Sequence, residues 1–336
     1  MIAARLHGVG DLRVAGEPGP GEPPPGWSLL AVTSVGICGS DLHWFTDGGI
    51  GENWIERPVV PGHEFAAIAL TGPHAGRRVA VDPAIPCQSC EMCRSGHHNL
   101  CPTVQFAGHG TLDGALREHL VWPDHLLFPL PDELSDDAGA LLEPLGVAIH
   151  AVGLGHVRPG SDVLVVGAGP IGVLATQVAR QSGAARVFAV EPLEHRRVSA
   201  LRSGADGVWS PEQGVEAVLD ATAGRGVDVA IELAGNDAAI ETAVAATRPG
   251  GRVALGGIPS EAQSSFPAAV ARRKGLTFAM VRRMNDTYPR AIELASTAID
   301  LDRLVTARYP LSDAAKAFTA AAERQGDKVV VTVSAT

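Results

Sequence analysis

Four of the five cysteines of this chain lie within sixteen residues, in the segment PCQSCEMCRSGHHNLC. Their spacing is C-x2-C-x2-C-x7-C, and thiolates this close in sequence form a tetrahedral shell around zinc without a long loop. Four thiolates leave no open position for a substrate, so the spacing predicts a structural zinc site, with an iron–sulfur cluster as the alternative. We expect His97 and His98, in the same loop, to face solvent. The predicted ligands are Cys87, Cys90, Cys93 and Cys101.

The fifth cysteine, Cys38, stands far upstream in the segment GICGSDLH. His63 and Glu64 follow in PGHEF, and Glu143 lies in LLEPLGVAIHA. One thiolate, one imidazole and carboxylate oxygen are the ligands of a catalytic zinc ion that keeps a position for water or substrate. Because the groups are scattered, each has an ordinary alternative: a buried thiol for Cys38, a turn histidine for His63 and a helix-start acid for Glu143.

A glycine-rich turn follows a strand-like run in VLVVGAGPIGVLATQVA. Gly167, Gly169 and Gly172 have the G-x-G-x-x-G spacing, and Pro170 and Ile171 lie between the last two glycines. This spacing permits a tight turn, a close approach of the backbone to a pyrophosphate, and close packing of a helix on the strand. The context of strand, turn and helix therefore predicts a dinucleotide-binding site.

An acidic residue, Glu191, closes the next strand-like run, 19 residues after Gly172. A carboxylate at this position binds the adenosine ribose and repels a 2′-phosphate, which favours NAD over NADP. Arg196 follows shortly after and could accept a 2′-phosphate or stack against adenine, so NADP stays an alternative.

The pattern of the chain changes near residue 145. Before it, short alternating runs separated by Pro and Gly clusters predict a β-rich domain. From residue 160 to about 284, apolar strand-like runs alternate with helical stretches, which is typical of a parallel sheet buried on both faces. The predicted fold class is thus an α/β Rossmann fold, a doubly wound parallel sheet, beside a β-rich domain that the last strand, DKVVVTV, can rejoin.

Composition limits the partners. The chain has 336 residues, 46% of them hydrophobic and 19% charged, as in a globular protein with two cores. Its net charge of −10 argues against nucleic acid or a membrane as the partner, because both bind through excess Lys and Arg. No apolar run is expected to cross a bilayer and the N-terminus lacks a signal-peptide pattern, so we expect a cytoplasmic protein.

The segments GICGSDLH, GHEF, the four-cysteine loop, EPLGVAIHA and VVGAGPIGV together resemble the zinc-dependent medium-chain alcohol dehydrogenases. Glu143 stands where ordinary members have a cysteine, which is similar to the sorbitol, idonate and polyol dehydrogenase branch. The resemblance implies an active site between two domains and a homodimer or homotetramer. It also implies a GroES-like catalytic domain at 1–145 with its zinc lobe at 86–102, a Rossmann domain at 146–284, and a segment at 285–336 that completes the catalytic domain.

The resemblance further implies a reaction. Cys38, His63 and Glu64 would bind zinc, and Glu143 would bind it directly or hold its water. Hydride would pass between NAD and a secondary alcohol of a polyol, sugar alcohol or sugar acid, the small-molecule substrate. Because one thiolate and two carboxylates make the metal shell net negative, we expect Glu64 or Glu143 to leave the metal when substrate binds.

Neighbouring residues take expected roles in the same scheme. Ser40 and His43 match the positions of a proton relay, and Asp41 is expected to cap a helix. Trp44, which replaces the tyrosine usual in sorbitol dehydrogenases, and Arg283 are expected to contact the substrate.

Three alternatives to this reading remain. They are an NADP-dependent zinc reductase of the same family, a zinc-stapled nucleic-acid binder, and a regulator with an inactive site. Glu191 argues against the first and the acidic charge against the second. The presence of every residue that the chemistry needs argues against the third.

Overall fold

The computed structural model describes all but five residues of the chain: residues 1–51, 53–110 and 112–333. The chain divides into two compact units, of which unit 1 comprises Met1–Glu143 and Tyr288–Thr336, and unit 2 comprises Pro144–Thr287. The first division falls two residues before the predicted boundary at 145, and the second three residues after the one at 284.

Unit 1 contains a seven-stranded sheet. Its strands are β3 (Trp27–Gly36), β6 (Glu64–Ala69), β7 (Arg78–Val81), β10 (His119–Pro123), β11 (Leu127–Pro129), β18 (Val305–Pro310) and β19 (Lys328–Thr332). They are arranged in the order β11-β7-β6-β3-β19-β18, and β10 also pairs with β3. Because β19 pairs antiparallel to β3, the end of the chain is part of the first domain's sheet.

Smaller elements complete unit 1. The two-stranded sheets are β1 (Ile2–Gly8) with β2 (Asp11–Gly16), β4 (Gly49–Ile50) with β5 (Asn53–Trp54), and β8 (Ala84–Ile85) with β9 (Gln105–Phe106). The helices are α1 (Gly39–Thr46), α2 (Glu91–Arg94), α9 (Tyr288–Thr297) and α10 (Ala314–Ala322), and the short 3-10 turns are η1 (His98–Leu100), η2 (Asp124–Leu126), η3 (Asp302–Leu304) and η4 (Leu311–Asp313).

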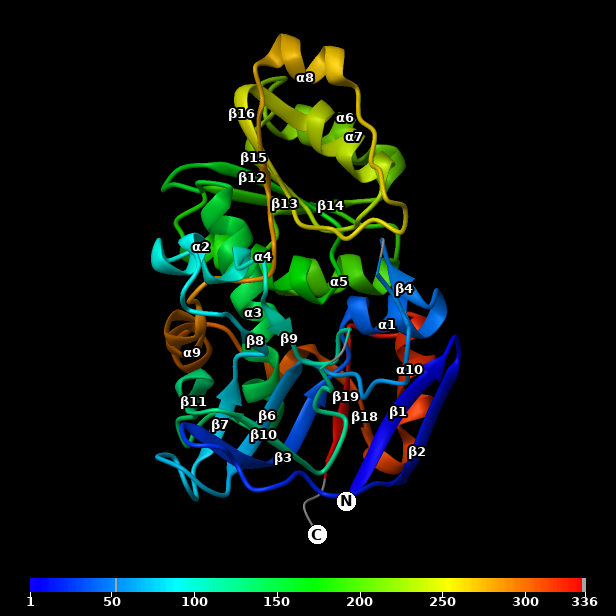
Figure 1. The fold of residues 1–336 in the computed structure, drawn as a ribbon. Coiled ribbons are helices and arrows are strands. Elements are labelled where there is room, and N and C mark those ends of the chain that lie inside the picture. The colour runs from blue at the N-terminus through cyan, green and yellow to red at the C-terminus, as the bar shows by residue number, and fades with distance from the viewer. Residues whose placement is uncertain (52, 111, 334–336) are drawn as a thin grey trace. The chain divides into compact units, whose positions relative to one another are not determined.

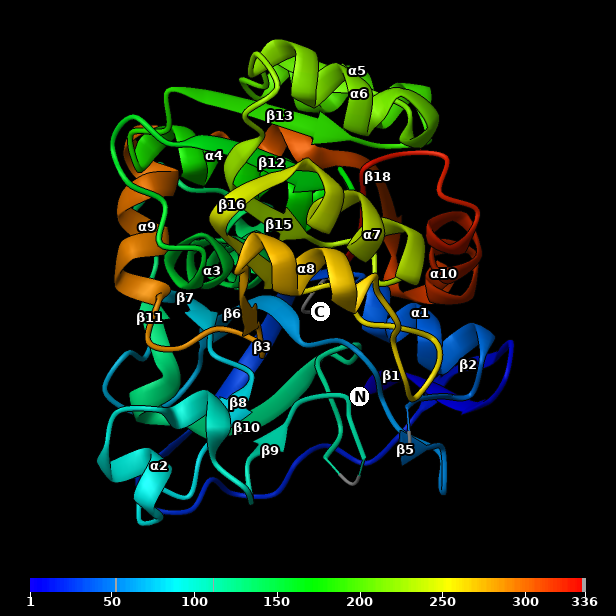
Figure 2. The ribbon, with the colours of Figure 1, turned by 90° about the horizontal axis from the view of Figure 1, so that it is seen from above.

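The core of unit 1 joins the sheet to helix α10. Phe65 and Trp122 from the sheet and Phe318 from α10 are each at most 1% exposed and belong to one hydrophobic cluster. Helix α10 lies beside α1 and β2 (Figures 1 and 2). The C-terminal segment therefore supports α1, the helix that follows Cys38.

Unit 2 is the predicted doubly wound fold. Its parallel strands are β12 (Asp162–Val166), β13 (Arg186–Val190), β14 (Gly207–Trp209), β15 (Val227–Glu232), β16 (Thr247–Leu255) and β17 (Thr277–Met280). They are arranged in the order β14-β13-β12-β15-β16-β17. The helices are α4 (Pro170–Gln181), α5 (Glu194–Arg202), α6 (Pro211–Ala221), α7 (Asp237–Ala246) and α8 (Ala268–Lys274). Figure 1 shows α4 and α5 on one face of this sheet and α6, α7 and α8 on the other, so the apolar strands are buried on both sides.

Helix α3 (Asp136–Leu154) runs across the division between the units and contains Pro144. Among the helices of the described ranges, it alone is long and apolar enough to cross a membrane by length and composition, which differs from the expectation that no run reaches that length. Because 67% of its apolar window is buried inside the structure, it has the character of a core helix. Glu143 lies in the middle of α3, so the alternative of a helix-start acid is wrong.

Candidate active site

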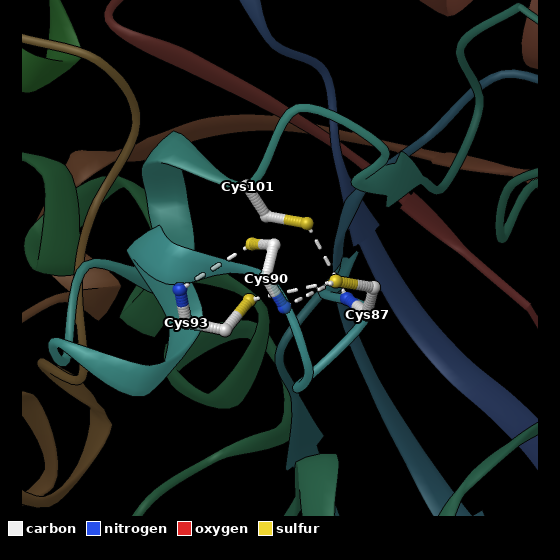
Figure 3. A group of neighbouring side chains, drawn as sticks. All are labelled: Cys87, Cys90, Cys93 and Cys101. Atoms are coloured by element: carbon white, nitrogen blue, oxygen red, sulfur yellow. Dashed lines mark hydrogen bonds between the residues drawn. The ribbon is translucent and has the colours of Figure 1, made fainter.

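The four clustered cysteines of unit 1 point their sulfurs toward one another (Figure 3). All four Sγ atoms lie within 4.8 Å of one another. Backbone amides hold them in place: the Cys90 amide donates to Cys87 Sγ at 3.3 Å, and the Cys93 amide donates to Cys90 Sγ at 3.4 Å. The cluster therefore has the donor set and the closeness that a closed zinc site requires.

The pKa values of two of these thiols are shifted in opposite directions. Hydrogen bonds from Ser89 and the following amide lower the pKa of Cys87 to about 5, whereas burial and neighbouring thiols raise the pKa of Cys93 to about 12. Thiolates this close cannot all ionise unless a cation lies between them.

His97 is exposed as expected, but His98 is partly buried and has a contact of its own, so the expectation of solvent exposure is wrong for His98.

A second group of metal-ligand side chains forms where β3 leads into α1. Cys38 is the N-cap residue of α1, Glu64 is the first residue of β6, and His63 directly precedes that strand. Gly36 pairs with Glu64 in the sheet, which brings the two segments side by side. The ligand atoms of Cys38, His63 and Glu64 lie within 4.8 Å of one another, and His63 and Glu64 are 3% and 1% exposed. A thiol, an imidazole and a carboxylate at this spacing suit zinc.

Glu143 is buried near this group but lies outside it. Its exposed fraction is 4%, and burial raises the pKa of its carboxyl to about 8 against the opposing charge of His63. The charge of Glu64 adds to this rise, so the two carboxylates are close enough to interact. The carboxylate of Glu143 is nevertheless absent from the set of ligand atoms within 4.8 Å of one another.

Asp41 does more than cap helix α1. Its Oδ2 accepts a hydrogen bond from the Cys38 amide at 3.1 Å, which is the expected capping contact. Its Oδ1 accepts from the Gly62 amide at 3.2 Å and lies 3.4 Å from His63 Nδ1. Burial works to raise the pKa of Asp41, but the charge of His63 and these hydrogen bonds outweigh it and the pKa is lowered. A carboxylate behind a metal-binding histidine fixes the orientation of the ring.

The two residues expected to relay protons have different surroundings. Ser40 is buried, and its Oγ lies 3.4 Å from His63 Nε2. His43 has 29% of its side chain exposed, and its Nδ1 lies 2.8 Å from Asp47 Oδ2. Ser40 therefore lies at the metal-ligand group, whereas His43 is partly exposed to solvent. The side chain of His43 contacts Asp47 and not Ser40.

Lys328 is a buried cation that no sequence pattern singled out. It begins β19, is 2% exposed, forms an ion pair with Glu64 and donates to the Ile37 carbonyl at 2.9 Å. Burial lowers the pKa of Lys328, but the negative charges of Glu64 and Cys38 outweigh this effect and the pKa is raised. In the sequence, a lysine before a final apolar strand looks like any surface lysine, so no local signal could have identified it.

The two residues expected to contact substrate lie in different units. Trp44 is 5% exposed, and the centroid of its ring lies 5.7 Å from that of His109. His109 stacks on Phe106 and lies 5.0 Å from the ring of His63, so this histidine, which the sequence patterns missed, belongs to the surroundings of the metal-ligand group. Arg283 is part of unit 2 and has a positive φ of 55°; its contact with substrate stays a prediction.

The glycine-rich turn of unit 2 has the predicted form. Strand β12 leads into Gly167, whose φ is 93°, and α4 begins at Pro170 with Gly169 as its N-cap. A Cβ at Gly167 would lie 2.9 Å from the Ala234 amide, and one at Gly172 would lie 2.0 Å from the Gly167 carbonyl. Neither position can hold a side chain, as the tight turn and the close packing of helix on strand require.

Glu191 and Arg196 lie beside this turn. Glu191 is 3% exposed, and its carboxylate accepts hydrogen bonds from the Ala168 amide at 2.8 Å and the Leu193 amide at 3.0 Å. The acid at the end of β13 is therefore held against the glycine turn. Nη1 of Arg196, on α5, would lie 3.7 Å from a Cβ at Gly169. The turn thus has both an acid that suits a ribose and a guanidinium near its second glycine.

Comparison with known proteins gives the family. Residues 24–132 match the alcohol dehydrogenase GroES-like domain, and residues 170–297 match the zinc-binding dehydrogenase family. Sorbitol dehydrogenase of Bacillus subtilis is 35% identical over 342 residues, which cover 99% of this chain and 97% of that protein. The chain belongs to the zinc-dependent medium-chain dehydrogenases. It is an enzyme, an oxidoreductase of the polyol dehydrogenase branch.

Solved structures of the family agree over nearly the whole chain. L-idonate 5-dehydrogenase from Escherichia coli has a TM-score of 0.89 at 26% identity, covering 98% of this chain and 97% of that one. A structure from Sinorhizobium meliloti bound to NADP has a TM-score of 0.89 at 30% identity, covering 98% of each chain. The predicted combination of a GroES-like and a Rossmann domain in this dehydrogenase is confirmed.

The residues present suit the zinc and nicotinamide cofactors of the family. Four mutually facing thiols suit a closed structural zinc site, and the Cys38, His63 and Glu64 group suits an open one. The turn that excludes side chains at Gly167 and Gly172 suits a dinucleotide pyrophosphate.

Proposed function

We propose that this dehydrogenase oxidises a secondary alcohol of a polyol, sugar alcohol or sugar acid and passes the hydride to NAD. The observation that carries the proposal is the meeting of Cys38, His63 and Glu64 within 4.8 Å in a buried part of unit 1. Such a donor set leaves a zinc ion room for a substrate oxygen. The names of two relatives, sorbitol dehydrogenase and L-idonate 5-dehydrogenase, support the substrate class.

The metal-ligand group has one chemical task in this scheme. Zinc held at the Cys38, His63 and Glu64 group would supply a Lewis acid that lowers the pKa of the substrate hydroxyl. Asp41 keeps the ring of His63 in one orientation. Glu143, buried and outside the direct ligand set, holds a water molecule or a substrate hydroxyl.

The proton of the alcohol leaves through helix α1. Ser40 lies beside the His63 ring and takes part in removing the proton, and His43 passes it to solvent. A neutral hydroxyl can donate one proton while it accepts another, and an imidazole can do the same through its two ring nitrogens. A water molecule or a turn of the His43 side chain would bridge the two.

The dinucleotide binds at the glycine-rich turn of unit 2. The turn at Gly167, Gly169 and Gly172, with Pro170 and Ile171 at the start of α4, places backbone amides for a pyrophosphate. Glu191 binds the ribose hydroxyls, which favours NAD. The second candidate function is an NADP-dependent reductase, which the guanidinium of Arg196 beside Gly169 favours. In either case, Arg196 lies where the adenosine end of the cofactor binds.

The remaining expected residues complete the proposal. Trp44 forms an apolar wall beside the metal-ligand group, and Arg283 provides a charge for a polar substrate. The four-cysteine lobe binds structural zinc. Cysteines that serve as zinc ligands must stay reduced, which suits a reducing compartment and supports a cytoplasmic location.

A homodimer or homotetramer is part of the same proposal. Strand β17 is the last strand of the unit 2 sheet, so one of its edges has no partner within that sheet. Met280, at the end of this strand, is 74% exposed. An edge strand with an exposed apolar side chain is a ready place for pairing with a second copy.

A substrate panel tests the proposal. Sorbitol, xylitol, idonate, galactitol, threitol, threonine and simple secondary alcohols are each offered with NAD and then with NADP. We expect turnover of at least one polyol or sugar acid, with NAD preferred. Turnover only of simple alcohols or only with NADP would favour the second candidate function, and no turnover of any compound by zinc-loaded protein would contradict both.

A further inference from the structure

Lys328 brings a positive charge into the Cys38, His63 and Glu64 group. Its side chain is buried, and its Nζ pairs with the Glu64 carboxylate and donates to the Ile37 carbonyl at 2.9 Å. The same Glu64 carboxylate lies within 4.8 Å of the ligand atoms of Cys38 and His63. One buried carboxylate therefore faces two cationic partners, the ammonium of Lys328 and the metal that the group would hold.

A buried carboxylate without a counter-charge is strongly destabilising, so Glu64 needs a cationic partner in every state of the enzyme. In the structure, Glu64 has Lys328 as such a partner. Bound zinc offers a second partner, and whichever of the two holds the carboxylate decides how many positions are left for substrate.

The backbone holds Lys328 in place for this role. Strand β19 pairs with β3 through Val330 and Gly36, and the Ile37 amide donates to the Val329 carbonyl at 3.0 Å. The ammonium is also tied to the Ile37 carbonyl, independently of Glu64. The carboxylate can therefore change partners while the lysine keeps one hydrogen bond.

We propose that Lys328 competes with the catalytic metal for Glu64 and so holds this carboxylate off the metal while substrate is bound. The inference rests on the proposed function, because it assumes a zinc ion at Cys38 and His63. Lys328 is a positioning residue, since it acts through Glu64 and need not touch the substrate. The inference identifies Glu64, rather than Glu143, as the carboxylate that leaves.

The direction in which zinc affinity changes when Lys328 is removed distinguishes competition for Glu64 from a merely structural role. If Lys328 only stabilised unit 1, its removal would loosen the metal-ligand group and weaken zinc binding. If it competes for Glu64, its removal leaves the metal-free state with an unpaired buried carboxylate, whereas the zinc-bound state keeps that carboxylate satisfied. Zinc then binds more tightly.

The test measures zinc dissociation constants of the full chain by competition with a chelator, resolved into the two zinc sites. For Lys328→Met, we expect zinc at the Cys38 group to bind about tenfold or more tightly, because the Glu64 carboxylate then lacks its ammonium partner until zinc binds. Zinc in the four-cysteine lobe should bind unchanged. Because Glu64 then stays on the metal, kcat should fall by about tenfold.

Lys274→Met is the matched control. Lys274 is a partly buried lysine of unit 2 whose Nζ also donates to backbone carbonyls, and it forms no ion pair with a carboxylate among the residues that the structure describes. The acceptors are the carbonyls of Val244 at 3.0 Å, Ala245 at 2.7 Å and Thr247 at 2.7 Å. Its removal should change neither zinc constant.

Combining Lys328→Met with a substitution of Glu64 shows whether the change in zinc affinity depends on this carboxylate. In Glu64→Gln protein, Lys328→Met should change zinc affinity by less than about twofold, since the group competed for is gone. Tightening that persists in this background, or weaker zinc binding in Lys328→Met alone, overturns the inference. If Lys328→Met does not fold, Lys328→Gln, which keeps a donor for the Ile37 carbonyl, is measured with the same expectations.

The number of zinc ions that wild-type protein binds distinguishes a failure of this inference from a failure of the proposed function. If it binds zinc only in the four-cysteine lobe, the proposed function fails and the inference with it. If it binds two zinc ions and Lys328→Met leaves both constants unchanged, the inference alone is overturned.

Discussion

Cys38, Glu64, Glu143 and Lys328 share one buried region of unit 1, and their charges must be counted together. Burial raises the pKa of Glu143 to about 8. Lys328 offsets the charge of Glu64. The expectation that one thiolate and two carboxylates make the metal shell net negative stays a prediction, and Lys328 adds a positive charge that this expectation did not count. A positive charge beside the metal-ligand group favours a substrate oxygen that loses its proton.

Glu191 makes the clearest prediction at the scale of single residues. Glu191→Ala removes the acceptor for the ribose hydroxyls and the charge that repels a 2′-phosphate. We expect the KM for NAD to rise by about tenfold or more, because hydrogen bonds to a charged group are lost. The ratio of kcat/KM with NADP to that with NAD should rise as well. Steady-state kinetics with both cofactors measure the two effects.

Glu194→Ala is the control, because Glu194 is an exposed acid in the first turn of α5. It should leave both KM values unchanged. An unchanged cofactor ratio in Glu191→Ala would show that this carboxylate only supports the glycine turn through Ala168 and Leu193.

The metal-ligand residues could be predicted from the sequence because each lies in a short recognisable segment. Cys38, His63 and Glu64 are examples, and the structure brings them together. Lys328 and His109 could not be predicted in this way. Lys328 reaches the group only through the pairing of β19 with β3, and His109 only through ring packing against Phe106. Both depend on tertiary contacts that no local pattern encodes.

At the scale of elements, the four-cysteine lobe contains little regular structure to hold it together. Its helix α2 has four residues and its turn η1 three. Cys90→Ser removes one zinc ligand, and we expect the free energy of unfolding to fall by about 2 kcal/mol or more. Turnover per folded molecule at low temperature should fall much less. Chemical denaturation together with kinetics at 15–20 °C, about the maximum of stability for many domains, checks this.

Cys38→Ser is the companion variant for the lobe. It should show the reverse pattern, with turnover lost and the free energy of unfolding little changed. If Cys90→Ser abolished turnover in fully folded protein, the lobe would have a catalytic rather than a structural role.

Asp228 joins the amino ends of several strands in unit 2 and makes a pH-dependent prediction. Its carboxylate accepts from Arg225, Arg248 and the Asp162 amide. Burial works to raise the pKa of Asp228, but these partners outweigh it and lower the pKa to about 2 from its ordinary 3.8. Since the folded-state pKa is lowered, the stabilisation is fully present above about pH 4 and is lost as the pH falls toward 2.

Asp228→Asn should therefore cost about 1–2 kcal/mol of unfolding free energy at pH 7, allowing for partial solvent screening. The difference from wild type should be constant between pH 8 and 5, as urea unfolding would show, and shrink below about pH 4. Asp220→Asn, at an exposed position of α6, should have no effect at any pH. A difference that grows on acidification would contradict the assignment.

The elements of unit 2 could be predicted because buried parallel strands read as continuous apolar runs. β12 is such a run, buried along its whole length. Helix α3 was harder to place, since Pro144 suggests a helix start after Glu143. In the structure the helix already begins at Asp136 and continues through Pro144, so Glu143 lies inside it.

At the scale of the whole molecule, the unpartnered edge of β17 makes the prediction. We expect wild-type protein to sediment as a dimer or tetramer. Met280→Lys adds a charge to the exposed end of the edge strand and should shift the distribution toward smaller species by about tenfold or more in dissociation constant. Analytical ultracentrifugation measures this. Leu70→Lys, at an exposed apolar residue of unit 1, is the control. Unchanged assembly in Met280→Lys would place the interface elsewhere.

The central claim is that a single thiolate, an imidazole and a carboxylate hold a reactive metal ion apart from the structural one. The most direct measurement is the zinc content of wild-type protein and of Cys38→Ala, together with hydride transfer to NAD. We predict about two zinc ions per chain in the wild type and about one in the variant, which stays folded and transfers no hydride. Equal zinc content in both proteins, or undiminished hydride transfer by Cys38→Ala, would contradict the claim.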